Sequence, residues 1–303
     1  MGHGEIRIGV DLGGTKIAGI ALTLAGDVVA SERVATPQGD YAATIQTVGE
    51  LVRRLETQSG GPATVGIGMP GSISPATGRV QNANSTWLNG KSFAENIEGA
   101  LERPVKLAND ANCFALSEAL DGAGEGAGSV FGVILGTGVG GGYVRSGRLL
   151  DGPRGIGGEW GHTPLPWASE HEFPGPNCWC GRRGCMETWA SGPGLAADHK
   201  REYAEDLSAE EIVLQAAQGD NKAGATLAHH ASRLARGLAG VINIIDPEVI
   251  VLGGGLSQLG YLYRVLPELI APHVFADQAQ VDIRSPKWGD ASGARGAARL
   301  WNN

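Results

Sequence analysis

Three cysteines and a histidine form a group of metal-binding residue types within a short part of the sequence. Cys178, Cys180 and Cys185 lie close together in the chain, and His162 precedes them. Three thiolates and one imidazole complete a closed tetrahedral zinc site, whereas a catalytic zinc ion keeps one position open. A disulfide or a redox pair is the alternative, although Cys-x-Cys spacing is less usual for either. The sequence therefore predicts a structural zinc site and leaves Cys113 as a small buried hydrophobic residue.

A pair of polar residues follows a strand predicted over Val105–Ala108. These residues are Asn109 and Asp110. At the end of a strand in an α/β fold, such a pair can bind a polyol, and the carboxylate can accept a proton from a hydroxyl group. Either side chain can equally cap the helix predicted to begin near Ala111. Both interpretations remain open on these residues alone.

Two glutamates flank the predicted zinc ligands. Glu159 lies three residues before His162, and Glu187 follows the last cysteine of the cluster. Alone, a glutamate is usually solvated and a histidine is usually structural. If zinc holds His162, however, it also fixes Glu159 and Glu187 on either side of the cluster, where both carboxylates would face a cleft.

A glycine-containing loop follows the first predicted strand of the chain. It consists of Asp11, Leu12, Gly13, Gly14, Thr15 and Lys16. Its glycines would let backbone N–H groups converge on phosphate oxygens, and Thr15 and Lys16 would add side-chain donors. Asp11 would orient water or Mg²⁺ between the phosphates. The alternative is a hairpin whose glycines only turn the chain.

Two further glycine runs follow predicted strands. The first begins with Gly136, Thr137 and Gly138, and the second consists of Gly253, Gly254 and Gly255. Residues 136–141 match G-x-G-x-x-G, but a dinucleotide-binding fingerprint must open a helix, and residues 142–147 have the pattern of a hairpin. Two loops of this kind can clamp a polyphosphate, while the third gives an adenosine ring a flat backbone surface.

The elements that position these residues alternate between strands and helices. Strands are predicted at 6–11, 17–23, 27–34, 65–69, 105–108, 129–135, 141–145, 148–149 and 248–252. Helices are predicted at 40–57, 93–101, 209–218, 224–243 and 291–301. The strand–glycine-turn–strand pattern of residues 9–15 returns at 132–138, which indicates two similar α/β domains around a cleft. Residues 153–194 show little periodicity and are predicted to form the zinc-binding insert.

Composition and charge exclude several classes of protein. The 303 residues are 42% hydrophobic and carry a formal net charge of −8. An acidic chain of this kind lacks the electrostatic footprint of a nucleic-acid-binding protein. No apolar stretch is long enough to span a bilayer, and no basic-then-apolar leader opens the chain, so we expect a cytoplasmic protein.

Together these motifs resemble the ROK family of sugar kinases and sugar-responsive repressors, which has the actin-like (ribonuclease H-like) ATPase fold. The likeness covers nearly the whole chain. Its most specific parts are the first glycine loop, Asn109-Asp110, Glu159–His162 and a cysteine cluster of the form C-x-C-G-x-x-G-C-x-E over 178–187. The expected domains are residues 1–108 plus about 290–303, and residues 109–289, which include the insert.

The resemblance also implies roles for these residues. Asp110 would be the general base of an ATP-dependent hexose kinase, and the three glycine runs would hold ATP together with Mg²⁺. Zn²⁺ would be structural, and the chain would form a homodimer. The sugar would be contacted by Asn84, Asn109, Asp110, Glu159, His162 and Glu187.

Within the family, the motifs at 70–75 and 82–90 and the segment around Asn109–Cys113 are most similar to bacterial fructokinases of the manno(fructo)kinase type. Fructose is therefore the expected substrate, with phosphorylation at its 6-hydroxyl. Glucose, mannose and N-acetylhexosamines are the alternatives. An N-acetyl group would need an apolar wall for its methyl, which nothing in Pro70–Asn89 clearly supplies.

Two other classes of protein compete with a kinase. A sugar-sensing repressor would need a DNA-reading module, for which we see no room before Asp11 and no candidate after the last helix. An actin-like or chaperone-like ATPase would not require the arrangement of Glu159, His162 and the cysteines. An intact Asp11–Lys16 loop together with Asp110 favours catalysis.

Overall fold

The computed structural model describes residues 6–302, and contacts divide the chain into two compact units. The first unit comprises 1–128, 142–158 and 287–303, and the second comprises 129–141 and 159–286. Residues 1–5 and 303 of the predicted first domain lie outside the described residues. The units differ from the predicted domains because segments 109–128 and 142–158 belong to the first unit. In that unit, helix 110–120 packs so closely on helix 292–299 that a Cβ atom at Gly296 would overlap the carbonyl oxygen of Cys113.

The first unit contains a five-stranded sheet of order β3-β2-β1-β4-β7. Its strands are β1 (Arg7–Leu12), β2 (Lys16–Leu22), β3 (Val28–Ala35), β4 (Thr64–Met69) and β7 (Val105–Asn109). Strands β1, β4 and β7 are parallel, with Asp11 opposite Gly68 and Met69 opposite Asn109. Because parallel strands end at the same edge of a sheet, this register brings Asp11 and Asn109-Asp110 to one edge.

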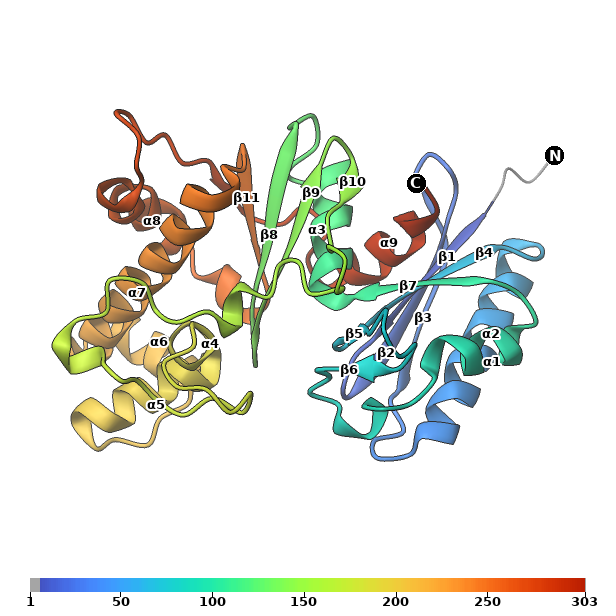
Figure 1. Cartoon of the computed structure of the whole chain (residues 1–303), viewed down its shortest axis with the longest axis horizontal. Helices are drawn as coiled ribbons and strands as arrows, with labels where there is room; N and C mark the ends of the chain where they lie inside the picture. The colour runs from blue at the N-terminus through green and yellow to red at the C-terminus, as the bar shows by residue number, and fades with distance from the viewer. Residues whose placement is uncertain (1–5, 303) are drawn as a thin grey trace. The chain divides into compact units, whose positions relative to one another are not determined.

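Helices cover both faces of this sheet. They are α1 (Tyr41–Ser59), α2 (Phe93–Leu101), α3 (Asp110–Leu120) and α9 (Ser292–Arg299). Figure 1 shows α1 and α2 on one side of the sheet and α9 on the other. Glycines permit the close approach of α9, since a Cβ atom at Gly9 or Gly66 would overlap the backbone of that helix. Two short strands, β5 (Ser72–Ile73) and β6 (Val80–Gln81), form a separate two-stranded sheet.

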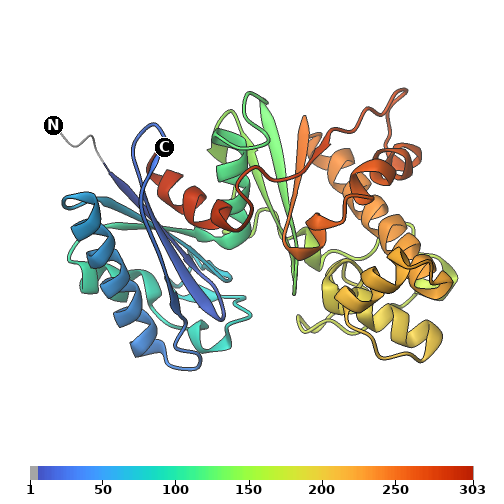
Figure 2. The ribbon, with the colours of Figure 1, turned by 180° about the vertical axis from the view of Figure 1, so that it is seen from behind.

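The second five-stranded sheet has the order β10-β9-β8-β11-β12. Its strands are β8 (Ser129–Leu135), β9 (Val139–Arg145), β10 (Arg148–Leu149), β11 (Val249–Gly253) and β12 (Ile283–Arg284). Strand β11 is parallel to both β8 and β12, with Gly253 opposite Ile134. The helices of the second unit lie beside β8 and β11 in Figure 2. They are α4 (Glu187–Ala190), α5 (Gly192–Tyr203), α6 (Ala209–Ala217), α7 (Asn221–Ile245) and α8 (Leu262–Ile270).

The predicted strands and helices are confirmed, most with boundaries shifted by a few residues. Helices α5 and α8 were not predicted, because Gly192-Pro193-Gly194 and Pro267 look like helix breakers in the sequence. In α5 the proline occupies the first turn, where its missing N–H costs nothing. Short 3-10 helices complete the fold at Thr86–Leu88, Trp160–His162, Glu170–Glu172, Gly255–Gln258, Ala271–His273, Gly289–Ala291 and Leu300–Asn302. Among residues 6–302, no helix has both the length and the apolar character needed to cross a bilayer.

Candidate active site

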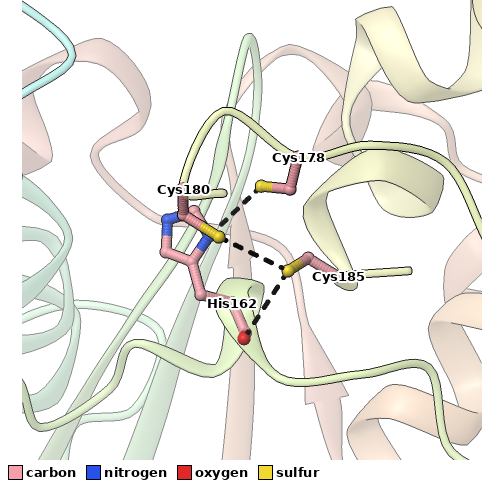
Figure 3. Close-up of side chains that lie close together, drawn as sticks. All are labelled: His162, Cys178, Cys180 and Cys185. Carbon is pink, nitrogen blue, oxygen red and sulfur yellow. Dashed lines mark hydrogen bonds between the residues drawn. The ribbon is translucent and has the colours of Figure 1, made fainter. Parts of the chain in front are cut away.

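The four predicted zinc ligands converge in the second unit. The ligand atoms of His162, Cys178, Cys180 and Cys185 all lie within 4.8 Å of one another (Figure 3). The Cys178 sulfur is 3.6 Å from Nδ1 of His162, and the Cys180 and Cys185 sulfurs are 3.7 Å apart. At a metal–sulfur distance of about 2.3 Å, the edge of a tetrahedron is about 3.8 Å, so these spacings fit one tetrahedral ion.

Backbone hydrogen bonds give this metal-ligand cluster its shape. The N–H of Gly181 donates to the Cys178 carbonyl at 3.0 Å and closes a turn, in which Gly181 has a φ of +86°. Burial raises the pKa of Cys185 to about 12 and also raises the pKa of Cys178. The pKa of Cys180 is lowered by hydrogen bonds from the Arg182 backbone and from the other two thiols, which outweigh burial. Burial thus favours the thiol form of Cys178 and Cys185, and a bound cation would favour their thiolates.

Glu187 begins α4, directly beyond the cysteines, and joins two parts of the second unit. Its Oε1 accepts a hydrogen bond from the indole N–H of Trp179 at 2.6 Å. Its Oε2 accepts from the backbone N–H of Val139 at 3.0 Å, at the start of β9. Nothing in the sequence indicates this use of Trp179, which lies between two predicted zinc ligands. The carboxylate of Glu187 is thus held between the cysteine cluster and the start of β9, next to a glycine run.

His162 and Glu159 are placed by a short 3-10 helix that packs on the start of β9. The indole N–H of Trp160 donates to the Gly140 carbonyl at 2.9 Å, and a Cβ atom at Gly161 would overlap the Val139 carbonyl. Because Nδ1 of His162 faces Cys178, its Nε2 is left for another partner. The structure therefore brings His162 and Glu187 to one region of the second unit.

The second and third glycine runs line one pocket in the second unit. This pocket has a volume of about 920 Å³ and is lined by Gly136, Thr137 and Gly255, together with residues of α5 and α6. Gly254 has a φ of +80°, and a Cβ atom there would overlap the Leu135 carbonyl, so the turn requires glycine. The other walls of the pocket are largely apolar, with Pro193, Val213 and Leu214 among them. Pro193 lies on α5, which the sequence did not predict, whereas Val213 and Leu214 lie on the predicted helix α6.

In the first unit, two carboxylates lie at the edge where β1 and β7 end. Asp11 is half-buried, and its pKa is raised to about 7 by burial and by the negative charge of Asp110. Solvent reaches Asp110, yet the protein around it raises the pKa of this carboxyl as well. Hydrogen bonds from the Ala111 N–H and from Asn109 offset part of that rise. A Cβ atom at Gly293 would lie 2.7 Å from Oδ2 of Asp11, so only glycine leaves room for this carboxylate.

Asn109 caps α3, as one of the two interpretations of the sequence predicts. Its Oδ1 accepts from the N–H groups of Ala111 and Asn112, at 2.9 and 3.4 Å. Its Nδ2 donates to the Gly71 carbonyl at 3.2 Å. An amide nitrogen carries two hydrogens, so Asn109 can donate both to the Gly71 carbonyl and to the Asp110 carboxylate. Asn109 therefore caps α3 and also holds the carboxylate of its neighbour Asp110.

The first glycine loop is held by side chains that follow β3. The hydroxyl of Thr36 donates to the Gly13 carbonyl at 2.8 Å, and the amide of Gln38 donates to the Gly14 carbonyl at 2.9 Å. The Lys16 ammonium lies 3.3 Å from the Asp290 carboxylate, and both side chains are exposed. These contacts fix the loop through its carbonyl groups.

Asn84 lies on an exposed loop of the same unit. The loop is fixed by Asn89, whose side chain accepts from the N–H of Ala83 at 2.9 Å and donates to its carbonyl at 2.8 Å. The neighbouring Ser85 is buried, and its hydroxyl would lie 3.7 Å from a Cβ atom at Gly14. The Asn84 loop and the first glycine loop are therefore neighbours.

Comparison with known proteins identifies the family. A profile of the ROK family matches residues 7–303. The chain belongs to the ROK family. An N-acetyl-D-glucosamine kinase of Pasteurella multocida is 38% identical over 301 residues, which is 98% of this chain and 99% of that protein.

Solved ROK structures share the fold. A ROK hexokinase from Thermus thermophilus is 32% identical with a TM-score of 0.85, and the match covers 97% of this chain and 96% of that one. A ROK family glucokinase from Streptomyces griseus, in complex with glucose and AMPPNP, is 28% identical with a TM-score of 0.79, over 97% of this chain and 98% of that one. The predicted actin-like fold is confirmed, and the chain is a ROK sugar kinase. The relative named above is an N-acetylglucosamine kinase, which favours the predicted alternative over fructokinase.

The raised pKa of Asp11 leads to a prediction about this ROK protein. At pH 8, Asp11→Asn should raise the unfolding temperature of the ligand-free protein, because it removes an ionised carboxylate that burial and Asp110 disfavour. The folded protein binds this proton more tightly than the unfolded chain does. The protonated carboxyl of Asp11 therefore makes its full contribution to the free energy of unfolding below about pH 4. This contribution is lost as the pH rises through about 7.

Thermal unfolding of wild type and Asp11→Asn at pH 5 and pH 8 measures this effect. We expect the variant to have the higher unfolding temperature at pH 8 and a clearly smaller advantage at pH 5, where most of the folded wild type still holds the proton. Asp206→Asn, at an exposed aspartate paired with Lys200, is the control and should show no such pH dependence. The same shift at both pH values would contradict the assignment to Asp11.

Proposed function

We propose that this ROK kinase transfers the γ-phosphoryl group of ATP to the 6-hydroxyl of N-acetylglucosamine. The observation that carries the proposal is the 38% identity to an N-acetyl-D-glucosamine kinase along almost the entire length of both chains. The motifs that favoured fructose cover far fewer residues. N-acetylglucosamine therefore replaces fructose as the proposed substrate, and fructose becomes a comparison substrate.

In the proposed reaction, Asp110 is the general base. Its carboxylate takes the proton of the 6-hydroxyl while that oxygen bonds to the γ-phosphorus, and the bond from this phosphorus to the bridging oxygen of ADP breaks. The products are ADP, the sugar 6-phosphate and a proton. The position of Asp110 supports the assignment, since it is solvent-accessible at the strand edge and its pKa is raised, which makes the carboxylate a better base.

We propose that the polar residues predicted from the sequence orient the sugar. Asn109 lies beside Asp110 at the end of β7, and Asn84 is exposed on a loop of the same unit. In the second unit, His162 has Nε2 available, and Glu187 is fixed by Trp179 and Val139. Glu159 would complete the set. A pocket that reads hydroxyl groups by hydrogen bonds discriminates well, because a mismatched sugar leaves buried polar groups unpaired.

ATP would be held by all three glycine runs. The pocket of about 920 Å³ has the size and the apolar walls for an adenosine, and Gly253, Gly254 and Gly255 form the turn at its rim. Gly136, Thr137 and Gly138, together with Gly13, Gly14, Thr15 and Lys16, would bind the phosphates. Asp11 would hold Mg²⁺, directly or through water, since a cation would relieve its repulsion from Asp110. When bound, this ion offsets the charge of the phosphates.

Zinc in this protein would be structural. The four ligands fill a tetrahedral shell and leave no open position for substrate. The ion would fix His162 and, through Trp179, the carboxylate of Glu187. The homodimer stays a prediction.

A substrate panel tests the proposed function. We expect ATP-dependent phosphorylation of N-acetylglucosamine with a kcat/KM at least tenfold above those for fructose, mannose, glucose and N-acetylmannosamine, because only the preferred sugar satisfies every polar group of the site. ADP release is measured for each sugar under one set of conditions. A tenfold lead for fructose would restore the prediction from the sequence motifs. ADP release that does not depend on any sugar would contradict the kinase assignment itself.

A further inference from the structure

A small cavity lies in the first unit beside Asn109, where β4 and β7 end. Its volume is about 70 Å³, and Met69, Ile73 and Leu107 contribute apolar walls. Ser72, Asn112 and Asp151 contribute polar groups. One water molecule needs about 10–15 Å³ of a cavity volume of this kind. The cavity therefore has room for a group of about five heavy atoms.

Asn112 is the unusual member of this lining. Its side chain is 3% exposed, and its Oδ1 is buried with no hydrogen-bond partner among the described residues. Buried carbonyl oxygens in proteins are nearly always paired, because leaving one unpaired costs free energy. The backbone N–H of the same residue bonds Asn109, which is one of the proposed sugar ligands. An unpaired acceptor therefore lies one helical turn from the sugar site.

Ser72 extends this lining toward the loop at Gly155. A Cβ atom at Gly155 would lie 3.8 Å from both Cβ and Oγ of Ser72, so this side chain lies against the cavity. The Ser72 hydroxyl accepts a hydrogen bond from the Gln81 amide at 3.1 Å. The cavity thus combines a free acceptor, a hydroxyl group and an apolar wall within a small volume.

We propose that this cavity seats the acetamido group of the sugar, with the amide N–H of that group donating to Oδ1 of Asn112. This inference rests on the proposed function and names the residues that select an N-acetylated sugar. A methyl group and a carbonyl would fill the cavity beside Met69 and Ile73, whereas the hydroxyl of glucose would leave most of it to water. The apolar wall that the sequence did not reveal is supplied partly by Ile73, within Pro70–Asn89, and partly by Met69 and Leu107 outside it.

Two variants test the seat directly. Asn112→Leu removes the acceptor at similar volume, and Ser72→Ile fills the cavity. We expect each to lower kcat/KM for N-acetylglucosamine at least tenfold while kcat/KM for glucose changes less than threefold. Asn112→Asp keeps an oxygen acceptor and should retain more of the preference for the N-acetylated sugar than Asn112→Leu does. The proposal would be overturned if the ratio of kcat/KM for N-acetylglucosamine to kcat/KM for glucose stayed as in the wild type in both Asn112→Leu and Ser72→Ile. An equal loss of kcat/KM for both sugars is one form of that result.

A series of substrates gives a second test that needs no variant. With the wild-type enzyme, glucosamine derivatives carrying N-acetyl, N-propanoyl and N-butanoyl groups differ only in the length of the acyl chain. A cavity of about 70 Å³ should accept the first and reject the last, with kcat/KM at least tenfold lower for N-butanoyl. Equal use of all three would place the acyl group elsewhere. These outcomes can be distinguished from a failure of the proposed function itself. If the proposed function were wrong, the wild-type enzyme would show no preference for N-acetylglucosamine over the other sugars.

Discussion

Asp110→Asn should lower kcat for sugar phosphorylation by roughly 10²–10⁴-fold and change the KM values little. Asparagine has nearly the same shape as aspartate, so α3 can still begin at this residue and Asn109 can still cap it. What disappears is the group that takes the proton of the acceptor hydroxyl. Steady-state kinetics with N-acetylglucosamine and ATP measure the loss, and protection by the sugar against thermal unfolding measures binding.

The pH dependence of the reaction gives a second readout for Asp110. Because surrounding protein raises the pKa of this carboxyl, the wild-type rate should fall with decreasing pH at a higher pH than an ordinary aspartate would require. Asp110→Asn should lose the part of this acidic limb that belongs to residue 110. Asp206→Asn, at an exposed aspartate of the second unit, is the matched control and should behave like wild type. Near-normal turnover by Asp110→Asn would remove the residue from the mechanism.

The placement of Asp11, Asn109 and Asp110 could be predicted from sequence because it follows from strand geometry. Each lies at or just beyond the end of an apolar run, and the parallel pairing of β1, β4 and β7 brings those ends to one edge. Cysteine spacing likewise predicted the cluster in the second unit, because few arrangements satisfy three thiols and an imidazole so close in the chain. The first prediction uses a general property of parallel sheets, and the second uses the short spacing of the ligands in the chain.

The parts that sequence did not reveal depend on residues far apart in the chain. The cavity beside Asn109 is built from β4, β5, β7, α3 and the loop at Gly155, so no single motif describes its volume. In the sequence, Asn112 looks like an ordinary residue of the first turn of a helix. Only the structure shows that its buried Oδ1 has no hydrogen-bond partner among the described residues. The fructose prediction uses short sequence motifs, and although one of them contains Ser72 and Ile73, no motif shows the volume that these residues enclose with the other elements. Sugar selectivity is therefore the property that sequence motifs alone predict least well in this chain.

The zinc site gives the second large expected effect. Purified without chelators, the wild-type protein should contain about one zinc ion per chain, and Cys185→Ser should contain essentially none, because three remaining ligands leave the tetrahedral shell open. We expect kcat/KM for the sugar to fall at least about tenfold in Cys185→Ser, since His162 and Trp179 lose their support. The KM for ATP should change less, because the pocket formed with α5 and α6 lies outside the cluster. Elemental analysis and steady-state kinetics measure both effects.

Cys113→Ala is the matched control for this cysteine substitution. Cys113 is fully buried in α3 of the first unit and is not among the grouped ligands, so the variant should keep its zinc even if it is less stable. The remaining alternative is a disulfide between Cys180 and Cys185, whose sulfurs are 3.7 Å apart. A disulfide would make the wild-type activity sensitive to dithiothreitol and insensitive to chelators, whereas a zinc site predicts the opposite pattern. If the wild-type protein contained no zinc and lost activity on reduction, the zinc assignment would be wrong. A disulfide would then be the element that fixes His162 and Glu187.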